Sequence, residues 1–140
     1  MIVVDAMNVI GAVPDGWWRD RPAALARLVD ALARHGFDAW VVIVADGRPV
    51  GGLPAGTHDR VELRYAGRSD PDAADDEIVA LVHQLVGDGT DDPADEPAAD
   101  PGDEGIAELT VVTSDRGLVA RLPTGVAVEG ARAFRRRVGW

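Results

Sequence analysis

The chain has 140 residues, of which 46% are hydrophobic, and its formal net charge is −10. This length fits a single domain with a hydrophobic core. No run approaches the roughly 20 apolar residues of a membrane span, and the first residues lack a secretory-signal pattern, so we expect a cytoplasmic protein without membrane contact. Cysteine is absent, which excludes disulfides and thiolate metal sites. All 14 basic residues are arginine, which excludes mechanisms that need a catalytic lysine.

Much of the negative charge is concentrated in one stretch, residues 87–105. This stretch contains eight acidic residues and no basic one, together with many Pro and Gly residues. Without it the chain has 14 basic and 16 acidic residues, so the net charge does not exclude a nucleic-acid partner. Its composition predicts a disordered acidic insertion within a single domain that spans residues 1–140.

The start of the chain contains two strand patterns on either side of a helix pattern. Continuous apolar runs at residues 2–5 and 39–45 predict buried parallel strands. Between them, apolar residues at i, i+3, i+4 and i+7 within Leu25–Leu32 predict one face of an amphipathic helix. Pro22 lies near its expected start and Gly36 just past its expected end.

The middle of the chain contains a loop pattern, a third strand and a second helix. Gly and Pro residues predict a loop over about 47–58. Charged and apolar residues then alternate over residues 60–65, which predicts a strand with one solvent-facing side at a sheet edge. A second helix is expected to start near Asp75, with an apolar stripe formed by Ile78, Leu81, Val82 and Leu85.

Two more strands are expected after the acidic insertion. Residues 109–113 and 126–129 fit strands, with a short helix through about Leu122 between them, and residues 130–137 fit a basic helix or arm. Strands that alternate with helices are typical of a parallel sheet covered on both faces. The sequence therefore predicts an α/β fold, a three-layer α/β/α sandwich with a mainly parallel sheet.

Four aspartates stand at predicted strand ends or helix starts: Asp5, Asp46, Asp75 and Asp115. The C-terminal ends of parallel strands share one edge of the sheet and the following helices begin above it, so the four side chains are expected to gather there. Their mutual repulsion favours a bound hard cation such as Mg²⁺ or Mn²⁺. Taken singly, each aspartate also fits a helix cap or a turn, so the hypothesis rests on their joint position.

Four sequence blocks around these aspartates resemble a known family. The blocks read VDAMNVIG, VVIVADGR, ADDEIVALV and VVTSDRGL, and the chain closes with GARAFRRRV. In this order they resemble NYN domains, in particular the YacP-like subgroup of the PIN-like ribonuclease superfamily. The resemblance covers nearly the whole chain outside the acidic insertion.

The resemblance implies a PIN-like sheet with strand order 3-2-1-4-5 and a metal-dependent endoribonuclease that uses Mg²⁺ or Mn²⁺. In that enzyme Asp5 would be the principal metal ligand. Asp75 and Asp115 would complete the acidic site, and Asp46 would support it. The implied substrate is single-stranded or structured RNA, with a ribosome or another RNA-processing assembly as a candidate partner.

Further residues are candidates for binding the substrate. By the resemblance, Asn8 would orient Asp5 or contact the scissile phosphate, and Thr113 and Ser114 would position water or phosphate. Trp17 and Trp18 fit either stacking on unpaired bases or packing in the core. Arginines on both sides of the 49–58 loop and in the tail are candidates for phosphate contacts: Arg48, Arg60, Arg64, Arg68, Arg132, Arg135, Arg136 and Arg137.

Three alternative functions remain in view. The first is a non-catalytic PIN-like module that binds RNA or a protein. The second is an aspartyl phosphotransferase, which is disfavoured because Met7 stands where that chemistry uses a second acid and because lysine is absent. The third is an autoinhibitory role of the acidic insertion, which would fold over the arginine-rich surface through charge complementarity.

Overall fold

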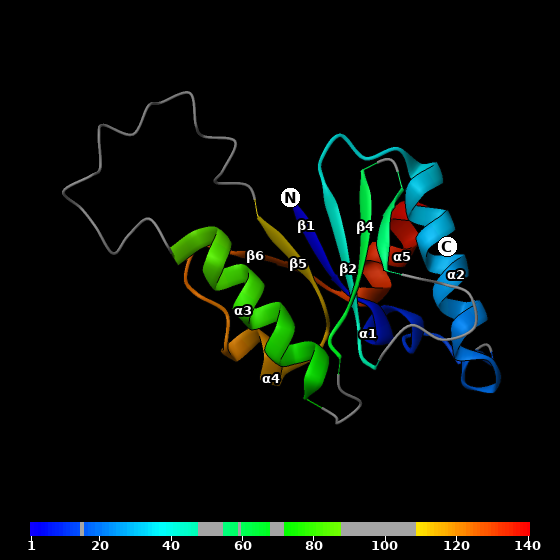
Figure 1. Ribbon diagram of the computed structural model, residues 1–140, viewed down its shortest axis with the longest axis horizontal. Helices are drawn as coiled ribbons and strands as arrows, with labels where there is room; N and C mark the ends of the chain where they lie inside the picture. Colours follow the sequence, from blue (N-terminus) through cyan, green and yellow to red (C-terminus); the bar gives the residue numbers. More distant parts are fainter. Residues whose placement is uncertain (15, 48–54, 59, 68–71, 88–108) are drawn as a thin grey trace.

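A computed structural model describes residues 1–14, 16–47, 55–58, 60–67, 72–87 and 109–140 (Figure 1). The strands are β1 (Ile2–Asp5), β2 (Val41–Ala45), β3 (Gly56–His58), β4 (Val61–Tyr65), β5 (Thr110–Val112) and β6 (Ala127–Glu129). The helices are α1 (Ala6–Ile10), α2 (Arg21–His35), α3 (Ala73–Gly87), α4 (Arg116–Ala120) and α5 (Ala131–Val138), with a 3-10 helix η1 (Trp17–Arg19).

The strands form one six-stranded sheet in the order β3-β4-β2-β1-β5-β6. All neighbouring pairs are parallel except β3–β4, which is antiparallel. The five predicted strands therefore have the expected order, which is consistent with a PIN-like fold. The prediction that β4 is an edge strand was wrong, because β3 pairs along its outer side. The predicted loop over 47–58 likewise ends in a strand that sequence patterns did not reveal.

Helices cover both faces of the sheet, which confirms the three-layer architecture (Figure 1). On one face, Val4 packs in a core with residues of α1, α2 and α5. On the other face, Val3 packs in a second core with residues of α3 and α4. This separation follows from the strand geometry, since successive side chains point to opposite faces of the sheet. Asp5 comes two residues after Val3, so its side chain lies on the same face of the sheet, the one covered by α3.

The predicted helix boundaries and stripes are largely confirmed. In α2, the Asp20 side chain accepts a hydrogen bond from the Ala23 N–H, and Gly36 ends the helix with a φ of 73°. In α3, the stripe residues Ile78, Leu81 and Val82 are buried. Leu85 is exposed, contrary to the prediction, because it lies in the last turn of α3, past the part of the helix packed on the sheet.

Some predicted features lie outside the described residues, namely nearly all of the acidic insertion, Arg48 and Arg68. Within the described ranges, no helix combines the length and apolarity that crossing a membrane would require.

Candidate active site at the C-terminal edge of the sheet

Asp5 is the most buried acidic side chain of the candidate site. It is the last residue of β1 and the N-cap of α1, and only 5% of it is exposed. Its side chain forms no capping hydrogen bond with α1. The short helix α1, which sequence patterns did not reveal, starts directly after Asp5 and carries Asn8 beside it.

Thr113 links Asp5 to Asp115. The Thr113 hydroxyl donates to Asp5 Oδ2 at 3.0 Å and accepts from the backbone N–H of Asp115 at 3.1 Å. Thr113 is 1% exposed, so its hydroxyl is enclosed between these partners. The expectation that Thr113 contacts water or phosphate is therefore wrong, and its contacts assign it to positioning Asp5.

Asp115 caps the helix that follows it. Its Oδ1 accepts hydrogen bonds from the N–H groups of Gly117 and Leu118, at 2.8 and 3.3 Å. This is the cap that Asp115 was also expected to fit, and the other oxygen, Oδ2, forms no hydrogen bond within the described part of the chain. A capping role and a role in the site are thus compatible.

Burial and neighbouring charges perturb the two inner carboxyls. Loss of solvent is the main cause that raises the pKa of Asp5 from 3.8 to about 6. The Thr113 hydroxyl lowers this pKa, and so does the nearby Asn8 backbone N–H, although its geometry falls short of a capping hydrogen bond; the charges of Asp75 and Asp115 raise the pKa. The pKa of Asp75 is also raised, first by burial and then by the charge of Asp115. Asp5, Asp75 and Asp115 therefore lie within electrostatic reach of one another.

Asp46 lies at the same edge of the sheet but is less closely connected. It follows β2 directly and is half-buried. By strand alternation it continues the side of Val44, which packs in the core beneath α3. Within the described residues Asp46 forms no hydrogen bond or ion pair. Only its position at the edge therefore relates it to Asp5, Asp75 and Asp115.

Asn8 and Ser114 connect three elements at this edge. Asn8 Oδ1 accepts a hydrogen bond from the Ser114 backbone N–H at 2.7 Å. The Ser114 hydroxyl accepts from the N–H of Ala131, in the first turn of α5, at 2.8 Å. With its oxygen engaged, the Asn8 side-chain amide keeps its N–H groups for another partner.

Arg121 is a residue of this edge that the sequence analysis missed. Its guanidinium forms an ion pair of 2.8 Å with Asp76, and its charge lowers the pKa of Asp75. Arg121 ends α4, whereas Asp76 lies in the first turn of α3. The two residues are 45 positions apart, so no local pattern could have indicated the pair.

The arginines of α5 do not form the uniform basic patch that was expected. Arg135 is buried, donates to the carbonyl oxygen of Val9 at 2.9 Å, and lies 4.1 Å from the Trp140 ring centroid. It therefore stabilises the junction of α5 with α1, and the expectation that it binds substrate is wrong. Arg137 pairs with Glu129. Arg132 is exposed and remains available to a substrate.

The described residues contain no group of three or more His, Asp or Glu side chains arranged to hold a metal ion. Asp5, Asp75 and Asp115 therefore act on one another through their charges without converging on a common point.

The fold has a counterpart among solved structures. The Rae1 (YacP) structure from Bacillus subtilis, solved as a W164L mutant, aligns with a TM-score of 0.61 over 99% of this chain and 74% of that chain. The chain has a YacP-like fold. The two sequences are 22% identical, so the similarity concerns the fold alone. Neither a family model nor a curated protein matches this chain.

Proposed function

We propose that this protein is a metal-dependent endoribonuclease that hydrolyses phosphodiester bonds of RNA at the C-terminal edge of its sheet. The observation that carries the proposal is the position of Asp5, buried at this edge against the Thr113 hydroxyl, with the carboxylates of Asp75 and Asp115 within electrostatic reach. The ordered motif blocks and the YacP-like fold support the same class of function.

The residues present fit Mg²⁺ or Mn²⁺ by their chemistry. Both ions prefer oxygen ligands, and Mg²⁺ is commonly held by one or two carboxylates together with water and substrate phosphates. We assign direct binding to Asp5 with Asp75 or Asp115, and assign the remaining carboxylates, including Asp46, to contacts through water. When bound, the ion would supply an activated water and neutralise charge on the leaving oxygen.

The protein groups around the carboxylates have separate roles in this proposal. Thr113 fixes the orientation of Asp5 through its hydroxyl. The Asn8 amide, held through its oxygen by the Ser114 N–H, would donate to a phosphate oxygen of the substrate. Arg121 holds Asp76 and so keeps the start of α3 beside α4. Exposed Arg132 would contact the phosphate backbone away from the scissile bond.

A non-catalytic RNA- or protein-binding module is the second candidate. It is favoured by the lack of a preformed metal-binding group among the described side chains. The two candidates differ in one property, because a binding module would hold RNA without cutting it at any metal concentration.

Cleavage of a labelled mixed-sequence single-stranded RNA tests the proposal, with EDTA, Mg²⁺ or Mn²⁺ in parallel. We expect metal-dependent cutting that Asp5→Asn and Asp115→Asn each reduce by about 100-fold or more, since a catalytic metal contributes several kcal/mol to the transition state. Asn keeps a side-chain oxygen at both positions, so the hydrogen bonds of Asp5 with Thr113 and of Asp115 with α4 are retained. Asp30→Asn, on the outer surface of α2, is the matched control and should cut normally.

Two outcomes would contradict this function. RNA that stays intact with every metal, while the folded wild type binds it, would establish the binding module instead. Cutting that survives both site substitutions would place the activity elsewhere or assign it to a contaminant.

A further inference from the structure

Two adjacent tryptophans in η1 have different environments. Trp17 is half-buried and packs against the main core, whereas Trp18 is 50% exposed. Their rings meet edge to face, with centroids 5.8 Å apart and planes at 87°. The half-buried Trp17 ring thus holds the Trp18 ring in place, and part of the Trp18 indole is open to solvent.

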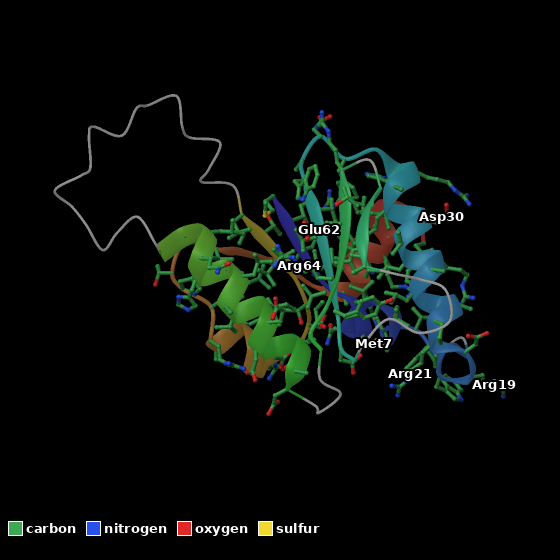
Figure 2. The ribbon with its side chains drawn as sticks, in the orientation of Figure 1. Met7, Arg19, Arg21, Asp30, Glu62 and Arg64 are labelled. Atoms are coloured by element: carbon green, nitrogen blue, oxygen red, sulfur yellow. The ribbon has the colours of Figure 1, made fainter. Side chains whose placement is uncertain are left out.

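This pair lies near the candidate active site. Trp17 packs beside Gly11, the residue that ends α1, where a Cβ would lie 3.5 Å from the Trp17 ring. The same helix carries Asn8 one turn earlier. Figure 2 shows Arg19 and Arg21 at the end of the molecule where Met7 of α1 lies, beyond the C-terminal end of β1.

The surface around Trp18 carries positive charge. Arg19 and Arg21 are both exposed, and neither forms an ion pair with another residue in the described part of the chain. The Arg21 guanidinium lies 5.5 Å from the Trp17 ring centroid, which orients it next to the aromatic pair. Asp20, between the two arginines, is engaged in capping α2.

We propose that Trp18, Arg19 and Arg21 form a binding platform for single-stranded RNA that leads into the acidic edge. The platform rests on the proposed ribonuclease function and specifies its substrate class. An exposed indole stacks on any unpaired base, and flanking arginines contact the adjacent phosphates without reading sequence. In a duplex the bases are stacked inside the helix and cannot reach Trp18, so the platform selects unpaired RNA over paired RNA.

Binding measurements on the full chain test this platform separately from cleavage. The Asp115→Asn variant serves as the uncut background, and the probe is a fluorescent mixed-sequence RNA, either single-stranded or annealed to its complement. We expect Trp18→Ala to weaken single-strand binding by about 5- to 150-fold. Trp40→Ala is the matched control, because Trp40 is 39% exposed but precedes β2 at the opposite edge of the sheet, and its affinity should not change.

The arginines are tested through the dependence of affinity on salt. Arg19→Gln and Arg21→Gln should each make the slope of log affinity against log salt shallower by about one, as expected for one lost phosphate contact. Arg34→Gln, at the far end of α2 and paired with Asp30, should leave the slope unchanged. A normal unfolding midpoint for each variant shows that the chain is folded.

Equal single-strand affinity for the Trp18→Ala and Trp40→Ala proteins would overturn the platform. Equal affinity of the Asp115→Asn background, with Trp18 intact, for single-stranded and duplex RNA would overturn the platform too. If Trp18→Ala changed only self-association in sedimentation, the surface would be a protein interface. None of these binding results depends on cleavage, so the platform and the ribonuclease function can fail separately. Loss of cleavage in Asp5→Asn would support the ribonuclease function even if the platform were wrong. RNA that the wild type leaves intact would refute the ribonuclease function.

Discussion

Carboxylates on the outer surface of the molecule and carboxylates at the acidic edge have opposite surroundings. On the surface, Asp30 pairs with Arg34 one turn later in α2, and both side chains are largely exposed. At the edge, Asp5 is bonded to an uncharged hydroxyl and has two further carboxylates near it. Arginine thus neutralises the surface acid. At the acidic edge Arg121 pairs with Asp76, but Asp5, Asp75 and Asp115 form no ion pair within the described part of the chain. The edge keeps an excess of negative charge that a cation could neutralise.

The largest effect that tests this comparison concerns the stability of Asp5→Asn. Because the pKa of Asp5 is about 6 in the folded protein and 3.8 ordinarily, the folded chain holds a proton between these values that the unfolded chain has released. The contribution of Asp5 to stability therefore falls as pH rises from about 4 to about 6 and stays low above that range. Without metal at neutral pH, we expect Asp5→Asn to raise the free energy of unfolding by roughly 2–3 kcal/mol.

Urea unfolding in EDTA at acidic and neutral pH measures this effect. Asp30→Asn, which removes a paired surface carboxylate, is the control. If the free energies of unfolding of Asp5→Asn and wild type differed by the same amount at both pH values, ionisation of Asp5 would not destabilise the folded protein. Added Mg²⁺ or Mn²⁺ should stabilise the wild type more than Asp5→Asn, because only the wild type keeps the full negative charge.

A smaller effect is expected for Thr113→Val, which removes one hydroxyl with little change of shape. Loss of this group frees Asp5 and leaves the Asp115 N–H without its acceptor, so metal-dependent cleavage should fall about 10- to 100-fold. The hydroxyl lowers the pKa of Asp5, so the acidic limb of the pH–rate profile should also move to higher pH. Thr113→Ser should restore both properties. A Val variant as active as wild type, with an unchanged profile, would remove Thr113 from the site.

The smallest effect is expected at the surface pair of α2. Arg34 and Asp30 are spaced i, i+4 and largely exposed, so Arg34→Gln should cost only about 0.3–0.5 kcal/mol of stability. Thermal unfolding at low and high salt measures this cost, which salt should reduce. A loss of several kcal/mol would mean that surface pairing is structural, and the contrast between the two regions would weaken.

The sequence by itself determined most of the strands and longer helices and their approximate ends, but not β3 or α1. Apolar runs made β1, β2 and β5 recognisable because buried parallel strands need no polar face. The helical repeat, Pro22 and Gly36 marked α2 because those signals are local to the chain. The gathering of Asp5, Asp75 and Asp115 at one edge followed from sheet geometry, since parallel strands end on the same side. Their roles with a metal ion and RNA stay predictions.

Only the tertiary structure decided which partner each polar side chain takes. Thr113 reaches Asp5 across 108 positions of sequence, and Arg135 reaches the Val9 carbonyl across 126. Arg135 looked like its exposed neighbour Arg132 in sequence, yet the packing of α5 on α1 buried one and left the other in solvent. Such choices depend on distances between elements far apart in the chain, whereas periodicity and composition report only on neighbours.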